Sequence, residues 1–102
     1  MGSRRSFLMR TTMIPDHAQP RLAGGVRLEI DGATGKGVLL FPEGILELNE
    51  TAHEIVTRCD GRPLNEIVLA LAQEYDVDPE MLAADVRETL ADLQRRKLVE
   101  FA

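Results

Sequence analysis

The sequence has no tryptophan and a single cysteine, and aromatic residues make up only 4% of its 102 residues. One cysteine forms no internal disulfide and does not supply the thiolates of the usual zinc sites, so we expect no metal and a reducing, cytoplasmic environment. No apolar run approaches the ~20 residues of a membrane-spanning helix, so no membrane association is expected. Because 44% of the residues are hydrophobic and so few are aromatic, the core must be aliphatic.

The sequence also lacks the side-chain arrangements that catalysis requires. His17 and His53 are the only histidines, and neither belongs to a pattern typical of a catalytic triad or a metal cluster. Cys59 lies on an apolar helical stripe and is interpreted as a core residue rather than a nucleophile. The glycines at 24–25 and 32–37 fit neither common nucleotide-binding fingerprint. We therefore expect a binding module, without catalytic residues or a cofactor, rather than an enzyme.

Charge is distributed unevenly along the chain, which carries 12 basic and 17 acidic residues. Residues 1–27 have a net charge of +4, whereas residues 28–102 have a net charge of −9. Residues 1–20 show neither helical nor strand periodicity, so we predict a flexible basic tail there and a single domain over residues 21–102. The twin-arginine-like stretch at residues 3–8 lacks the apolar segment of an export signal and is interpreted as a chance match.

Three segments have the patterns of β-strands. Residues 26–30 alternate apolar and charged side chains, residues 37–41 are apolar after an initial glycine, and residues 45–48 form a shorter strand. Turn residues at 31–35 and 42–44 separate these segments. Because short turns join antiparallel neighbours, the pattern predicts a three-stranded antiparallel meander.

After residue 48 the hydrophobic period changes from two to 3.6 residues, which indicates helices. We expect a short helix capped by Asn49, a second that begins at Pro63, and a third that starts after Asp78 and runs to about Lys97. The last apolar residues of the chain should pack back on the core. Strands followed by helices predict an α+β domain, and its last two helices resemble a helix-turn-helix beside a β-hairpin wing.

The predicted meander leaves a strand edge with unpaired backbone donors and acceptors. Either Glu47 protects this edge from aggregation, or the edge captures a peptide by strand addition, and the pattern favours neither interpretation. The polar face of the third helix is too acidic to suit the phosphates of DNA and better suits basic side chains of a partner. It carries Asp85, Glu88, Thr89, Asp92 and Arg96.

Several ordered groups of residues match one known family at that family's spacing. They lie at Pro20–Leu28, Leu39–Ala52, Cys59–Leu71 and Asp85–Val99. In these residues the chain resembles the PqqD family of pyrroloquinoline quinone (PQQ) biosynthesis over residues 20–102. The basic tail lies outside the resemblance, and Pro63 stands where family members more often have a polar cap residue.

The resemblance implies a winged-helix-like recognition domain for ribosomally made, modified peptides, without a DNA role. Such a protein binds the precursor peptide PqqA and presents it to PqqE, a radical S-adenosylmethionine enzyme that cross-links a Glu and a Tyr of the peptide. In related domains the peptide adds as a strand beside the third strand, in a groove walled by the third helix. The peptide-binding residues implied here are Ile45, Leu46, Glu47, Leu48, Asp85, Val86, Thr89, Leu90, Asp92, Leu93 and Arg96.

Two other classes of function remain open at this point. A DNA-binding winged-helix regulator would share the fold, although the charge of −9 on residues 28–102 argues against a nucleic-acid partner. A homo-oligomeric interaction module could use the same strand edge to pair with itself and form a homodimer.

Overall fold

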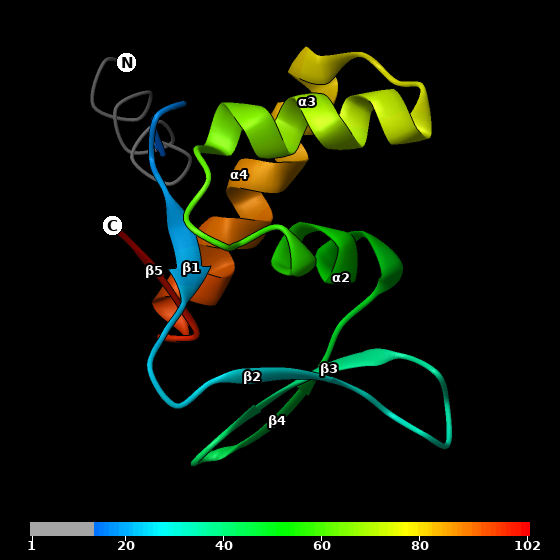
Figure 1. Cartoon of the computed structure of the whole chain (residues 1–102), viewed down its shortest axis with the longest axis vertical. Helices are drawn as coiled ribbons and strands as arrows, with labels where there is room; N and C mark the ends of the chain where they lie inside the picture. The colour runs from blue at the N-terminus through cyan, green and yellow to red at the C-terminus, as the bar shows by residue number, and fades with distance from the viewer. Residues whose placement is uncertain (1–13) are drawn as a thin grey trace, which may run out of the picture.

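The computed structural model describes residues 14–102 (Figure 1). The elements in chain order are β1 (Pro20–Leu22), β2 (Arg27–Ile30), β3 (Gly37–Phe41), β4 (Gly44–Glu47), α2 (Glu50–Thr57), α3 (Leu64–Tyr75), α4 (Pro79–Arg95) and β5 (Val99–Phe101). Figure 1 shows the meander of β2, β3 and β4 at one end of the molecule, the helices beyond it, and β1 beside β5 at the flank. The predicted α+β class is confirmed.

The three-stranded antiparallel meander is present as predicted, in the order β2–β3–β4. Its register places Leu39 opposite both Leu28 and Leu46. Leu39 is fully buried, and its two partners pack against the same core, so these leucines form the face that meets the helices. Leu48 lies just beyond β4, but its backbone N–H still donates to the carbonyl of Gly37 at 2.9 Å.

The three predicted helices are also present, with the expected caps. The side-chain oxygen of Asn49 accepts from the backbone N–H of Ala52 at 2.7 Å and starts α2. Asp78 caps α4 in the same way, and a proline follows it at the first helical position. The last helix ends at Arg95, two residues before the predicted end, because Lys97 adopts a φ of 64° that breaks the helical backbone.

A second sheet of two strands was not predicted. β1 pairs with β5 in antiparallel register, with Pro20 opposite Phe101 and Leu22 opposite Val99. Three-residue strands are too short to show an alternating pattern, so only the tertiary pairing reveals them. The expected packing of the C-terminal segment on the core is confirmed, since Leu98 and Val99 are each 2% exposed.

The packed part of the chain begins earlier than the predicted boundary at residue 21. Ile14 belongs to the core cluster, and its carbonyl accepts from Nε of Arg87 at 2.8 Å. The same guanidinium pairs with Asp16, and the carbonyl of Ala18 accepts from the N–H of Leu64. One apolar anchor and several hydrogen bonds thus fix a segment that has no periodicity. Residues 1–13, with the twin-arginine-like stretch, lie outside the described residues.

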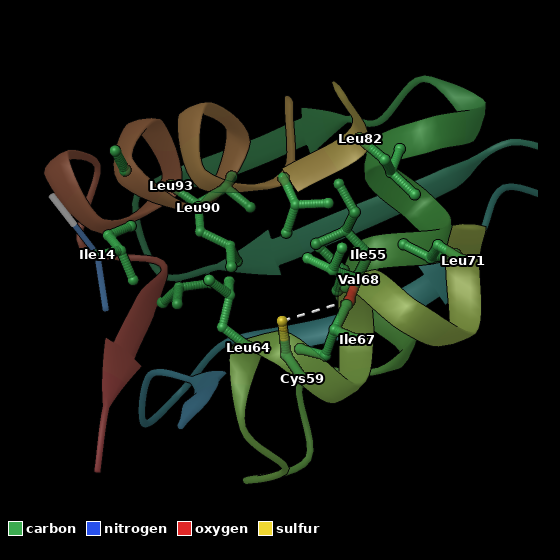
Figure 2. Close-up of a cluster of buried hydrophobic side chains, with 14 of the residues drawn as sticks. Ile14, Ile55, Cys59, Leu64, Ile67, Val68, Leu71, Leu82, Leu90 and Leu93 are labelled. Carbon is green, nitrogen blue, oxygen red and sulfur yellow. Dashed lines mark hydrogen bonds between the residues drawn. The ribbon is translucent and has the colours of Figure 1, made fainter. Parts of the chain in front are cut away.

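The core is aliphatic, as the composition predicted (Figure 2). Its fully buried centre brings together residues from β3 and all three helices. These are Leu39, Ile55, Leu64, Ile67, Leu71, Val86 and Leu90. Cys59 joins this cluster, and its thiol donates to the carbonyl of Ile55 at 3.4 Å. The interpretation of Cys59 as a core residue is therefore confirmed.

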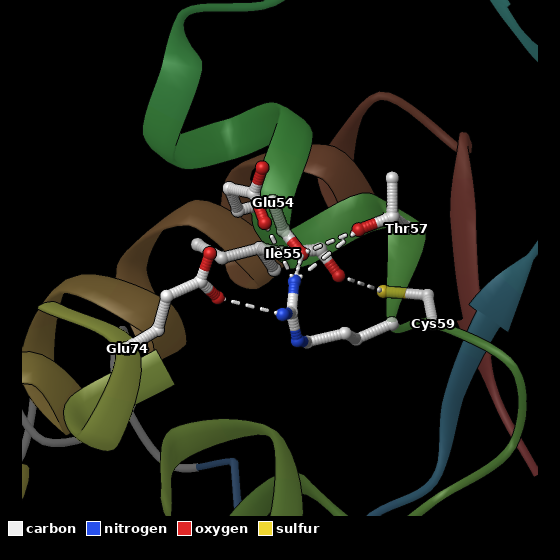
Figure 3. A network of polar contacts seen from close by, with 6 residues as sticks. Glu54, Ile55, Thr57, Cys59 and Glu74 are labelled. Atoms are coloured by element: carbon white, nitrogen blue, oxygen red, sulfur yellow. Dashed lines mark hydrogen bonds and ion pairs between the residues drawn. The ribbon is translucent and has the colours of Figure 1, made fainter. Parts of the chain in front are cut away.

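A polar network links α2 to α3 (Figure 3). The Arg58 guanidinium bonds to Oε1 of Glu54 at 2.8 Å within its own turn, and to Oε1 of Glu74 in α3 at 2.8 Å. The arginine side chain is 22% exposed, so much of its stem lies against the protein. This network helps to set the orientation of α2, whose first turn borders the site described next.

Candidate functional site

The outer edge of β4 presents backbone groups that are not used by the sheet. Within residues 14–102, β4 pairs only with β3. The N–H of Leu48 points to β3, where it donates to Gly37. Because inward and outward groups alternate along a strand, the backbone of Leu46 also faces β3, whereas the N–H and C=O groups of Ile45 and Glu47 face outward. The fold therefore offers a template for one more strand.

A groove lies alongside this edge, between β4, the start of α2 and the C-terminal half of α4. Its volume is about 570 Å³. The groove is lined by Leu46, Glu47, Leu48, Asn49, Ala52, Glu88, Thr89, Asp92, Leu93, Arg95 and Arg96. An extended segment entering it would meet the strand edge on one side and a helix face on the other.

Most of the residues carried over from the family line this groove. They are Leu46, Glu47, Leu48, Thr89, Asp92, Leu93 and Arg96. The leucines supply an apolar floor, with Leu48 and Leu93 largely buried, and Thr89, Asp92 and Arg96 supply polar groups from α4. Glu47 borders the groove from the edge of the strand. The strand and the helix that the family resemblance implied thus both border the groove.

Four of the predicted residues do not line the groove. Val86 and Leu90 are 0% exposed and belong to the core, because their positions on α4 face the other helices. Ile45 is 62% exposed and alternates with Leu46, so its side chain lies on the sheet face away from α4. Asp85 is exposed and lies three residues before Glu88, the first residue of α4 that lines the groove, so it stands just outside one end of the groove.

Four lining residues were missing from the predicted set. Glu88 belongs to the polar face recognised in the sequence, one turn before Asp92, so its helical spacing was an available signal. Arg95 neighbours a predicted residue in the last turn. Asn49 and Ala52 line the groove because α2 begins immediately after β4, so the predicted strand and the predicted cap at Asn49 were an available signal for them.

The charges of the groove are partly paired. Asp92 accepts from Arg96 at 3.0 Å and from Arg95 at 3.3 Å, so one carboxylate serves two guanidinium groups. On the strand side, Oε1 of Glu47 lies 3.7 Å from Nζ of Lys36. Glu88 makes no ion pair with any residue in the described range 14–102. These exposed pairs contribute little to stability and leave their charges available to a ligand.

The polar side chains of the groove are carboxylates, guanidinium groups, an amide and a hydroxyl. Its lining contains no histidine, cysteine or lysine. Cys59 lies in the core, where burial raises the pKa of its thiol to about 12 and keeps it protonated. In the part of the chain that the structure describes, no group of three or more His, Cys, Asp or Glu residues could hold a metal ion. Over the same residues, no helix is long and apolar enough to span a membrane.

Comparison with known proteins assigns the family. The sequence model of coenzyme PQQ synthesis protein D (PqqD) matches residues 36–99, which include both walls of the groove. This chain belongs to the PqqD family. Among its PqqD-type relatives, a PqqA binding protein of Xanthomonas oryzae pv. oryzae (strain PXO99A) is 45% identical over 82 residues. That match covers 79% of this chain and 89% of the relative.

A second PqqD-type relative is part of a larger protein. The bifunctional coenzyme PQQ synthesis protein C/D of Methylorubrum extorquens is 39% identical over 82 residues, which cover 79% of this chain and 22% of that protein. In that relative a PqqD-like segment is therefore fused to another PQQ synthesis protein.

Two solved structures share the PqqD fold. The PqqD truncation of Methylobacterium extorquens PqqCD, solved by NMR and described as a stand-alone recognition element for ribosomally synthesised and post-translationally modified peptides, matches with a TM-score of 0.76. It is 36% identical, and the match covers 90% of this chain and 99% of that one. Lasso peptide synthetase B1, complexed with a leader peptide, matches with a TM-score of 0.70 at 27% identity, covering 81% of this chain and 99% of that one.

Proposed function

We propose that this PqqD-family chain is a non-catalytic peptide chaperone that binds the precursor peptide PqqA by strand addition at β4. The observation that carries the proposal is the outward-facing backbone of Ile45 and Glu47 beside the groove walled by α4. Backbone hydrogen bonds to such an edge supply affinity, and the groove beside it supplies selectivity. Relatives named PqqA binding protein, and the structural likeness to a synthetase complexed with a leader peptide, support the peptide as ligand.

The proposed role includes presentation of bound PqqA to the radical S-adenosylmethionine enzyme PqqE. A chaperone that holds the peptide and also contacts the enzyme raises the local concentration of substrate at the catalytic centre. The fusion of a PqqD-like segment to another PQQ synthesis protein in Methylorubrum extorquens supports action close to the biosynthetic enzymes. Presentation of this kind needs no catalytic group from the chaperone itself.

The first test is an NMR titration of the isotope-labelled chain with a synthetic PqqA peptide. We expect saturable shifts of the amides of residues 45–48 and of the groove-facing residues Thr89, Asp92 and Arg96. Shifts confined to the opposite sheet edge, β2, would contradict strand addition at β4. Absence of shifts, in a sample that gel filtration over a range of concentrations shows to be monomeric, would contradict binding of the peptide by this chain alone.

Gel filtration also tests the competing idea of a homo-oligomeric module. If the β4 edge pairs with itself, the apparent mass rises with protein concentration and falls when PqqA is added. A mass that stays monomeric throughout is the result expected for a chaperone whose β4 edge is free for the peptide.

A further inference from the structure

The groove has two ends with different chemical character. One end lies near the turn before β4, where Arg96 also borders a neighbouring hollow with Phe41, Pro42 and Glu43. The other end lies at Asn49 and Ala52, where α2 begins. α4 thus runs against the direction of β4, with its last turn beside the beginning of the strand.

Positive charge gathers at the turn end of the groove. Arg95 and Arg96 both bond to Asp92, at 3.3 Å and 3.0 Å, so two guanidinium groups share one carboxylate and an excess positive charge remains. The arginine side chains are 61% and 54% exposed, which leaves donor groups accessible to a ligand in the groove. An acidic side chain of a bound peptide could bind there.

Negative charge lies toward the other end. Glu88 lines the groove two helical turns before Arg96, which corresponds to about 12 Å along the axis of α4. Its carboxylate makes no ion pair within residues 14–102. A basic side chain of a bound peptide is the natural partner for this group. The wall formed by α4 therefore carries opposite charges at its two ends, negative toward α2 and positive toward the turn before β4.

We propose that this polarity makes the groove select peptides in which a basic residue precedes an acidic residue by four positions. The inference rests on the proposed function, with the peptide pairing antiparallel to β4 as the other strands of the sheet do. In this orientation the N-terminal part of the bound peptide lies at the α2 end of the groove and its C-terminal part lies at the turn end. Residues on one face of a strand recur every two positions, and four residues span about 13 Å, which matches the separation of Glu88 from Arg96. Glu88 is then a specificity-determining residue.

The test measures the affinity of a set of PqqA peptides in which each residue in turn is replaced by Lys or by Glu. Fluorescence anisotropy gives Kd for wild-type protein, Glu88→Lys and Arg96→Glu. We expect one peptide position where Lys binds about two- to fivefold tighter than Glu, as for an exposed ion pair. Glu88→Lys should reverse that preference. Four positions later Glu should be preferred, and Arg96→Glu should reverse this second preference.

Glu80→Lys is the matched control. It makes the same charge reversal on an exposed position of the same helix, two turns before Glu88 and outside the groove, so it should leave both preferences unchanged. The preferences should also weaken as salt rises from about 0.05 to 0.5 M, because exposed pairs are screened. Thermal melting confirms that each variant is folded.

Three results overturn the inference and are distinguishable from failure of the proposed function. If wild-type protein binds unsubstituted PqqA but neither preference appears, or Glu80→Lys changes them as much as Glu88→Lys does, the charge selectivity is wrong while peptide binding stands. A preference for the opposite order of charges also overturns it. If no peptide binds at all, peptide capture itself is wrong, and the inference falls with it.

Discussion

Replacement of Glu47 by proline tests strand addition most directly. The outward orientation of its N–H follows from the bond between Leu48 and Gly37, since backbone groups alternate along β4. Proline removes this donor without removing a hydrogen bond between β4 and β3. Proline is tolerated on edge strands for the same reason. The fold should survive the substitution, while the template for the peptide loses one of its donors.

The expected loss of affinity follows from the energy of one backbone hydrogen bond. Exchange of a protein–peptide bond for bonds to water costs a net ~0.5–1.5 kcal/mol, which raises Kd by roughly two- to twelvefold. The loss is larger if the peptide carbonyl stays buried without a donor. Isothermal titration calorimetry with PqqA measures this change, and thermal unfolding shows whether the free protein remains stable.

Two further variants separate the backbone effect from other causes. Glu47→Gln removes the charge that faces Lys36 at 3.7 Å but keeps the N–H, so it should bind nearly as wild type does. Leu46→Pro removes an inward-facing N–H and should destabilise the domain itself. If Glu47→Pro is folded and binds PqqA as tightly as Glu47→Gln does, pairing at this position of β4 is refuted.

Three predictions concern the fold. Gly37→Ala should lower the free energy of unfolding by about 1–3 kcal/mol in chemical denaturation, because its Cβ would lie 2.9 Å from the ring of His53. Adding His53→Ala to this variant should restore much of the loss. Gly32→Ala is the control, because a Cβ there would have no atom within 4 Å. Ile14→Ala should destabilise the domain by about 2 kcal/mol, because a core contact is lost; an unchanged midpoint would place this residue outside the core. Burial raises the pKa of the Cys59 thiol to about 12 in the folded protein, against 9.0 in the unfolded chain. The protonated thiol therefore contributes to stability below pH 9, and this contribution is lost as the pH rises toward 12. Between pH 7 and 10 the free energy of unfolding of the wild type should fall by about 1.4 kcal/mol more than that of Cys59→Ala, and equal losses would contradict the buried thiol.

The elements that the sequence predicts well are those with a local signal. The switch from alternating to helical periodicity after residue 48, the cap at Asn49 and the Asp78–Pro79 start all lie within a few residues of the feature they determine. The pairing of β1 with β5 has no local signal, because it joins two three-residue segments at opposite ends of the described chain. The anchoring of Ile14 is likewise decided by its contacts with distant residues.

The same distinction explains which of the candidate residues line the groove. Periodicity shows that α4 has an apolar and a polar side, but not which apolar positions pack against the helices and which face the groove. Val86 and Leu90 face the core, while Leu93, one turn further on, is buried yet borders the groove. The helical spacing places Glu88 on the polar face, but only the position of α4 relative to β4 shows that this residue lines the groove.

The position of α4 also bears on why an open strand edge is tolerable in this fold. An exposed edge invites pairing with the sheet of another molecule, which proteins normally prevent with charges, bulges or covering elements. Here α4 lines one side of the groove beside the β4 edge, so an additional strand at this edge would lie against the helix. The charged side chains of Glu88, Asp92 and Arg96 further disfavour an apolar strand. Protection of the edge by Glu47 and capture of a peptide are therefore compatible under the proposed function, because the charges of Glu47 and α4 oppose pairing with an apolar strand while the groove remains open to a peptide of complementary charge.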